Sequence, residues 1–146
     1  MKQNTRKITA VLLMLTLMFA FASCGNTPET PETSLWSSAV YQEDTELGEG
    51  AKTLGIKVTA EEKSIVITIK SDAETVGEAL LENGVVEGSD GAFGLYISHV
   101  NGIKAVYEED GAYWGFLDKD GNLMSVGVDM TELLDGDVYE LRYTKS

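Results

Sequence analysis

The chain has 146 residues, and its 24 Asp and Glu against 11 Lys and Arg give a formal charge of −13. A surface this acidic repels phosphate backbones, and no cluster of Lys and Arg follows residue 23, so we expect no nucleic-acid partner. Cys24 is the only cysteine, which excludes an internal disulfide and any zinc site built from several cysteines.

The first 23 residues have the pattern of an export signal. The start is basic, residues 8–21 are apolar apart from two threonines, and two small residues follow. This apolar run is shorter than the about 20 residues that a permanent membrane helix needs. The string FASC, which ends at Cys24, resembles the lipobox at which bacteria attach diacylglycerol to a cysteine and cleave before it. We expect a signal peptide over 1–23 and a lipid on Cys24; the alternative is a secretory signal that leaves a free thiol.

A short tether is predicted next, over residues 24–34. Its two prolines alternate with Thr and Glu, and it has no apolar residue to bury, so it should be extended and disordered. Residues 35–146 then suffice for a single hydrophobic core. Without the leader, eight basic residues face 24 acidic ones, which makes the charge −16.

The first elements of this domain are read from apolar runs and helix signals. Residues 36–41 and 56–58 are predicted to pair as a first hairpin, and the β-branched run 65–69 predicts a strand with alternating faces. Thr75 and Glu78 form a capping box, and Val76, Ala79 and Leu80 follow at helical spacing. A short helix is therefore expected, ending near residue 83.

Further strands are predicted after Gly94, each bounded by Gly, Asn or Asp. They cover residues 95–97, 103–106, 113–117, 123–126 and 138–143, with turns at 101–102, 110–111, 120–121 and 135–136. One helix among several strands predicts an α+β fold in which the helix packs on one face of a mixed sheet.

The order of these motifs resembles a known family. The segments YQEDTELGEG, TVGEALLENGVV, GLYISHVNGI, the YW strand with its hairpin, and VGVDMTELLDGDVYELRY follow one another over most of residues 36–145. Together they resemble the transcobalamin-like C-terminal domain family, which is similar to the small β-domain of transcobalamin and intrinsic factor. The resemblance implies a β-grasp-like fold. In the vertebrate carriers this domain covers one face of cobalamin, while a helical barrel that this chain has no room for holds the other.

The resemblance also implies where a ligand would bind. The family's YW strand and the turn after it correspond to a set of residues that we take as the candidate ligand contacts: Tyr113, Trp114, Phe116, Asn122, Leu123 and Met124. In a strand Tyr113 and Trp114 point to opposite faces, so at least one of them is expected in the core. Met124 is expected to fill the core.

Other residue patterns do not indicate catalysis or a metal. The Asp-Gly segments at 118–122 and 135–137 hint at calcium loops, but their spacing does not fit an EF-hand and hairpin turns explain them better. Ser98 and His99 are adjacent on a predicted strand and so should face opposite ways. We expect no enzyme, no resident cofactor and no metal site.

The function favoured by these features is a lipid-anchored, monomeric binding module on the extracytoplasmic face of the cell membrane. It would capture a small molecule, such as cobalamin or another corrinoid, for a membrane transporter. The alternative is a surface adhesion or protein-interaction domain that binds through an exposed strand edge or aromatic patch.

Overall fold

The computed structural model describes residues 33–146. The predictions for the signal peptide, for the lipid on Cys24 and for most of the tether lie outside the described residues. Within the described part no helix is long and apolar enough to cross a membrane.

The central feature of the fold is an antiparallel hairpin of two long strands, β2 (Lys52–Ala60) and β3 (Lys63–Ser71). Burial alternates along both strands, and Ile65, Ile67 and Ile69 are almost completely buried. The strand predicted at 65–69 is thereby confirmed. The β-branched side chains of one face supply much of the core, while the other face stays open.

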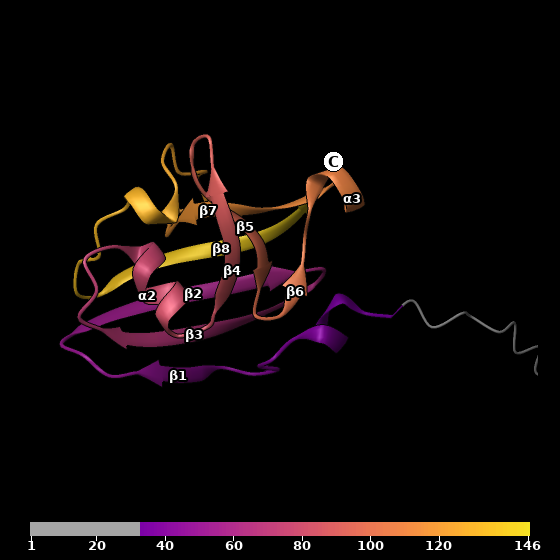
Figure 1. The fold of residues 1–146 in the computed structure, drawn as a ribbon. Coiled ribbons are helices and arrows are strands. Elements are labelled where there is room, and N and C mark those ends of the chain that lie inside the picture. The colour runs from indigo at the N-terminus through magenta and orange to yellow at the C-terminus, as the bar shows by residue number, and fades with distance from the viewer. Residues whose placement is uncertain (1–32) are drawn as a thin grey trace, which may run out of the picture. The chain divides into compact units, whose positions relative to one another are not determined.

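Three more strands complete a five-stranded sheet in the order β1-β3-β2-β8-β7 (Figure 1). The last strand, β8 (Asp137–Lys145), lies parallel to β2, and β7 (Ala112–Asp118) pairs antiparallel with β8. A short strand, β1 (Thr45–Gly48), lies parallel to β3 at the opposite edge. The sheet therefore mixes parallel and antiparallel pairs, as predicted.

One short helix, α2 (Val76–Glu82), packs on the inner face of this sheet. It begins with the predicted capping box: the Thr75 hydroxyl accepts the Glu78 N–H, and the Glu78 carboxylate accepts the Thr75 N–H. Val76, Ala79 and Leu80 are fully buried. A sheet that encloses a single helix after its first hairpin is the arrangement of a β-grasp-like α+β fold, so the predicted fold class is confirmed.

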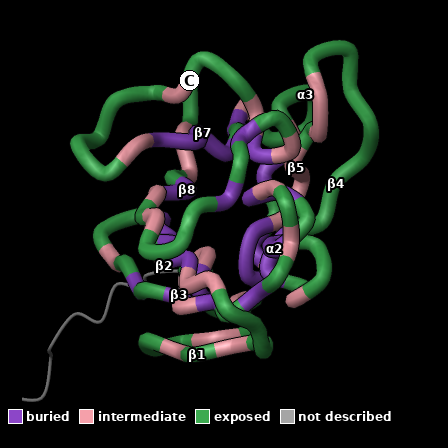
Figure 2. The backbone as a smooth tube through the Cα atoms, turned by 90° about the vertical axis from the view of Figure 1, so that its left-hand side faces the viewer, coloured by how far each residue is buried: buried purple, intermediate pink, exposed green. Residues whose placement is uncertain are grey.

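A small second sheet is inserted between α2 and β7. It consists of β4 (Val86–Gly91), β5 (Gly94–Val100) and β6 (Ile103–Lys104) in that order. The predicted turn between β5 and β6 is present, with φ of 51° at Asn101 and 79° at Gly102. Figure 2 shows that the β4–β5 hairpin is mostly exposed, whereas α2 and β2 carry the buried core.

The predicted first hairpin is wrong. Residues 35–38 form a short 3-10 helix, η1 (Leu35–Ser38), in which the Trp36 indole N–H donates to the Ala60 carbonyl at 2.9 Å. The Tyr41 main chain is held by the Asn101 side chain, with both hydrogen bonds at 2.8 Å. This segment is therefore held by long-range hydrogen bonds and not by a strand ladder, and the antiparallel partner of β2 is β3.

Two other strands differ from prediction. The strand predicted at 103–106 is shortened to β6, because residues 107–110 turn into the short helix α3 (Tyr107–Asp110), which ends at Gly111 with φ of 64°. The strand predicted at 123–126 is wrong, because only a single bridge joins Leu123 to Leu117. The chain then leaves the edge of β7 and enters a second 3-10 helix, η2 (Val128–Met130).

The open outer face of the five-stranded sheet carries an ion pair between a buried glutamate and an exposed arginine. Glu140 is only 8% exposed, and both oxygens of its carboxylate accept hydrogen bonds from the Arg142 guanidinium, at 3.0 and 2.8 Å. Burial opposes ionisation of Glu140, but Arg142, with Thr59 and Lys57 nearby, outweighs it and lowers the pKa of this carboxyl. Glu140 is therefore a charge that the fold keeps ionised.

Candidate functional site

An uncharged groove of about 530 Å³ lies along the free edge of β7. Its walls are the tip of the β4–β5 hairpin on one side and the loop from β7 to η2 on the other. Twelve residues line it, and none is charged: Ala92, Phe93, Tyr113, Trp114, Gly115, Phe116, Leu123, Met124, Ser125, Val126, Gly127 and Met130. In a chain with 24 acidic residues, such a lining selects for an apolar partner.

The floor of the groove is aromatic and rigid. Trp114 is 8% exposed, and its indole N–H donates to the Ile103 carbonyl at 3.2 Å. Its ring meets Tyr143 edge to face, with centroids 5.7 Å apart, and Phe116 packs against Tyr139 at 5.0 Å. These contacts hold the two rings in place before any ligand arrives.

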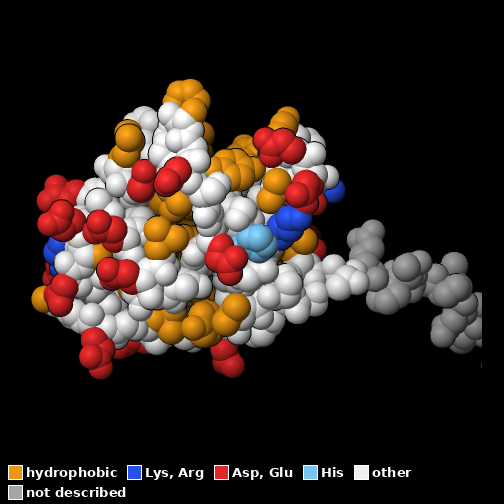
Figure 3. Space-filling view, viewed as in Figure 1, with side chains coloured by type: hydrophobic (Ala, Val, Ile, Leu, Met, Phe, Trp, Pro, Cys, Tyr) orange, Lys and Arg blue, Asp and Glu red, His pale blue; other side chains and the backbone are white. Residues whose placement is uncertain are grey.

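The rim of the groove consists of exposed apolar side chains. Phe93, at the hairpin tip, is 92% exposed, and Tyr113, Leu123, Val126 and Met130 are exposed as well. Figure 3 shows orange hydrophobic side chains at the upper end of this hairpin, while red carboxylates are spread over the same face of the domain. Exposed apolar groups gathered around a concavity are typical of a binding surface.

The main chain of β7 is only partly paired on the side of the groove. The Phe116 carbonyl accepts the Met124 N–H at 2.9 Å, and the Asp118 N–H donates to the Asn122 carbonyl at 2.9 Å, both on the side away from β8. Because alternate residues of a strand direct their main-chain groups the same way, Trp114 also points its N–H and C=O to this edge. No main-chain group of the described residues pairs with them there.

The structure brings together five of the six predicted ligand contacts. Tyr113, Trp114, Phe116, Leu123 and Met124 all line the groove, with Tyr113 exposed and Trp114 buried, as strand alternation predicts. Met124 packs against the core, as expected.

The sixth predicted contact, Asn122, does not line the groove. Its side chain and main-chain N–H both donate to the Asp118 carboxylate, which also accepts the Asp120 N–H. These hydrogen bonds, the ones from Asn122 foremost, lower the pKa of Asp118. The acidic segment 118–122 is thus a turn in which one carboxylate binds the main chain.

Seven of the twelve groove residues were not among the predicted ligand contacts, and Phe93, Val126 and Met130 are the large exposed ones among them. Phe93 and Met130 lie in segments without strand or helix periodicity, and Val126 was predicted at the end of a strand but not as a ligand contact. The sequence does contain one signal for Phe93, which lies between Gly91 and Gly94. An aromatic side chain in a glycine-rich turn cannot reach the core, so it indicates an exposed contact surface.

The predicted separation of Ser98 and His99 is wrong. The Ser98 hydroxyl and His99 Nδ1 are 3.0 Å apart, because the pairing of β4 with β5 shifts register between Glu87 and Gly88 and leaves Ser98 as the bulged residue. Glu87 lies 3.9 Å from the same Nδ1. A serine and a carboxylate that share one ring nitrogen cannot form a catalytic relay, which needs both nitrogens.

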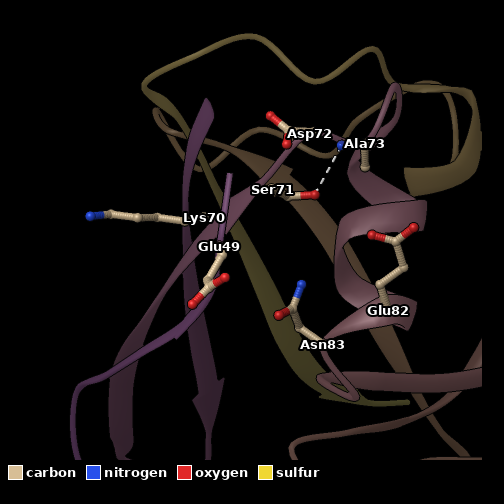
Figure 4. Close-up of a pocket in the computed structure, with 7 residues that line it drawn as sticks. All are labelled: Glu49, Lys70, Ser71, Asp72, Ala73, Glu82 and Asn83. Carbon is tan, nitrogen blue, oxygen red and sulfur yellow. Dashed lines mark hydrogen bonds between the residues drawn. The ribbon is translucent and has the colours of Figure 1, made fainter. Parts of the chain in front are cut away.

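A second, polar hollow lies between β1, β3 and the end of α2 (Figure 4). It is lined by Glu49, Lys70, Ser71, Asp72, Ala73, Glu82 and Asn83. The view shows that the carboxylates do not converge and that Lys70 points away. Asp72 instead accepts the Ala51 N–H at 2.9 Å. In residues 33–146 no three His, Cys, Asp or Glu side chains come close enough together to hold a metal.

Comparison with known proteins gives the family. The sequence profile described as "Domain of unknown function (DUF4430)" matches residues 73–145, which is half of the chain. The chain belongs to this family. The matched part runs from the start of α2 to the end of β8 and includes all groove residues, so the family match contains the whole candidate site.

Two solved structures resemble the domain. A protein from Ruminococcus gnavus, proposed to bind metal, is 27% identical with a TM-score of 0.60; the match covers 66% of this chain and 99% of that chain. Haptocorrin in complex with Cbi is 21% identical with a TM-score of 0.47; the match covers 64% of this chain and only 25% of haptocorrin. No curated protein matches. The family match bears out the predicted resemblance to the transcobalamin-like C-terminal domain family.

Proposed function

We propose that this domain is a non-catalytic receptor module that binds a small molecule with a flat apolar face in the groove along β7. The observation that carries the proposal is the lining itself. Twelve uncharged residues surround a concavity of about 530 Å³, in a domain whose surface is otherwise strongly acidic. The volume lies within the range of about 300–1,000 Å³ that small-molecule sites usually have.

A corrinoid is the candidate ligand that the family resemblance implies. The rigid floor of Trp114 and Phe116 offers apolar area to a planar molecule, and the rim gives it side contacts. We further propose that the lipid on Cys24 holds the domain at the extracytoplasmic membrane face, where it would deliver its ligand to a transporter.

Metal binding, which has been proposed for the R. gnavus protein, is not part of the proposal for this chain. A divalent metal needs several ligating side chains at one point, and residues 33–146 bring no three of them together. The groove offers aromatic and aliphatic groups in their place.

The open edge of β7 supports a second candidate function. Trp114 presents a free main-chain N–H and C=O beside exposed apolar side chains, which is what an added peptide strand needs. In this alternative the partner is an extended segment of another surface protein.

Calorimetric titration with cobalamin, cobinamide and haem tests the first candidate. We expect saturable binding that weakens about tenfold in Tyr113→Ala and in Leu123→Ser, because each change removes apolar area from the rim. Tyr107→Ala and Leu134→Ser are matched controls, since both residues are exposed but lie outside the groove. Trp114 is left intact because its removal would disturb the core.

The outcomes separate the two candidates. Binding that the controls weaken as much as the rim variants would place the site elsewhere. Absence of binding for all three ligands would remove corrin-like molecules from consideration and leave strand addition to β7 as the function to pursue.

A further inference from the structure

One carboxylate beside the groove is packed in an unusual way. Asp129 lies on η2 between two groove residues, Gly127 and Met130. A Cβ placed on Gly127 would lie 2.7 Å from Asp129 Oδ1, and one on Gly94 would lie 2.7 Å from the same oxygen. A Cβ on Gly77 of α2 would lie 2.8 Å from the Asp129 Cα. Three glycines thus pack against this residue, one on α2, one on β5 and one just before η2.

The enclosed oxygen has no hydrogen-bond partner. Asp129 Oδ1 is buried, and no donor from the described residues reaches it. Other aspartates of the fold are used differently: Asp44, Asp72 and Asp135 each accept a main-chain N–H, at 2.8 to 2.9 Å. An orphaned carboxylate oxygen costs folding free energy, because it loses water without gaining a donor. Such an oxygen is free to accept a hydrogen bond from a donor outside the chain.

The position of Asp129 indicates from which side a donor would reach Oδ1. Gly127 lines the groove, and Gly94 directly follows Phe93 of the groove wall, so Oδ1 lies behind these two glycines at the end of the groove. The hairpin tip that carries Phe93 is exposed, and a donor from the groove would have to displace it to reach Oδ1.

We infer that Asp129 binds a cationic hydrogen-bond donor, such as an ammonium group, at one end of the molecule held in the groove. The ligand class is then a flat apolar body with one amino group. The inference rests on the proposed small-molecule function of the groove. A charged donor forms a stronger hydrogen bond to a carboxylate than a neutral one does, so Asp129 would act as a specificity determinant.

Three probes with the same ring test this directly: 1-naphthylmethylamine, 1-naphthalenemethanol and 1-naphthoic acid. They are titrated calorimetrically into the purified protein. We expect the amine to bind at least about tenfold more tightly than the alcohol, and the acid to bind most weakly. In Asp129→Asn the preference for the amine should disappear. In Asp90→Asn, which removes an equal charge from exposed strand β4, it should persist.

A second variant keeps the carboxylate and blocks it. Gly127→Ala places a methyl group against Oδ1, and Gly127 has φ of −73°, which alanine adopts without strain. We expect this variant to lose the preference for the amine as well. The thermal midpoint of Asp129→Asn should stay the same or rise, because an orphaned charge is removed.

The results that overturn the inference are distinct from those that overturn the proposed function. An unchanged preference for the amine in Asp129→Asn, or a thermal midpoint lowered by several degrees, makes Asp129 a structural residue while groove binding stands. If none of the three probes binds while cobalamin, cobinamide or haem does, the inference falls and the proposed function stands; if none of the six molecules binds, both fall.

Discussion

Neighbouring residues of β7 have different roles that follow from their partners. Trp114 is held by the Ile103 carbonyl and by Tyr143, so it serves as a fixed part of the groove floor. Tyr113 points the other way and is exposed at the rim. Substitution of Trp114 would therefore disturb core packing as well as the groove, whereas Tyr113 can be changed with little effect on packing.

The ion pair on the outer sheet face predicts how stability depends on pH. Because the pKa of Glu140 is lowered below its ordinary value of 4.5, this group stabilises the fold fully above pH 4.5, and the contribution is lost as the pH falls through the folded-state pKa. In Glu140→Gln we expect lower stability near neutral pH and a shallower loss on acidification. Urea unfolding at several pH values between about 7 and 3 measures both effects.

The control for this prediction is Glu46→Gln, because Glu46 forms an exposed ion pair with Lys70 at 3.3 Å. Exposed pairs contribute about 0–1 kcal/mol, so the control should follow the unchanged protein closely. If Glu140→Gln and the unchanged protein lost stability in parallel below pH 4.5, the carboxylate would not contribute as described.

At the scale of elements, helix α2 depends on a glycine in its first turn. Alanine is normally preferred over glycine in a helix by about 1 kcal/mol. At Gly77, however, a Cβ would lie 2.8 Å from the Cα of Asp129 and 2.9 Å from its nitrogen, both main-chain atoms of η2. We expect Gly77→Ala to destabilise the protein by about 1–3 kcal/mol, against the helix preference.

Chemical denaturation of Gly77→Ala beside Gly55→Ala checks this. The nearest atom to a Cβ on Gly55 is a Val138 methyl at 3.4 Å, an ordinary contact. Only the first variant should lose stability strongly. A Gly77→Ala protein as stable as the parent would show that α2 and η2 are free to move apart.

The elements that could be predicted carry their signal within a few residues. The alternation of Ile65, Ile67 and Ile69 and the capping box at Thr75 are local, and both predictions are confirmed. Strand β1 escaped prediction because its four residues have no clear alternation and are fixed by parallel pairing with β3. Strand β4 is mostly exposed and glycine-rich, and only its pairing with β5 makes it a strand.

The candidate site could be predicted in part for the same reason. Strand alternation correctly predicted that Tyr113 and Trp114 face opposite ways and that at least one is in the core, because β7 is regular; which of the two is buried came only from the structure. It failed for Ser98 and His99, where a bulge brings two successive side chains together. Phe93 joins the groove from a hairpin turn and Met130 from the end of η2, and no sequence periodicity predicts where such short segments lie in the fold.

At the scale of the whole molecule, the contrast between an acidic surface and an uncharged groove predicts weak salt dependence. Binding of 1-naphthalenemethanol should change less than about twofold between about 0.02 and 0.5 M NaCl, because no charge lines the groove. Spermine, a polycation, should bind the acidic surface and lose its affinity steeply over the same range. Calorimetry measures both. A steep fall for the neutral probe would mean that it binds outside the groove.

The position of β8 governs when the molecule can fold. Strand β8 (residues 137–145) is the last strand in the sequence, yet it lies between β2 and β7 in the sheet. Neither of these two strand pairings can form before β8 is present. Until β8 is in place, β2 has an open edge, and β7 is bonded only to the segment 122–124 on its other side. Its contacts with β2 join residues about 80 positions apart, and such pairing is slow to form. A nascent chain lacking these final residues would expose two unpaired edges, which makes it prone to aggregation and a substrate for chaperones and proteases.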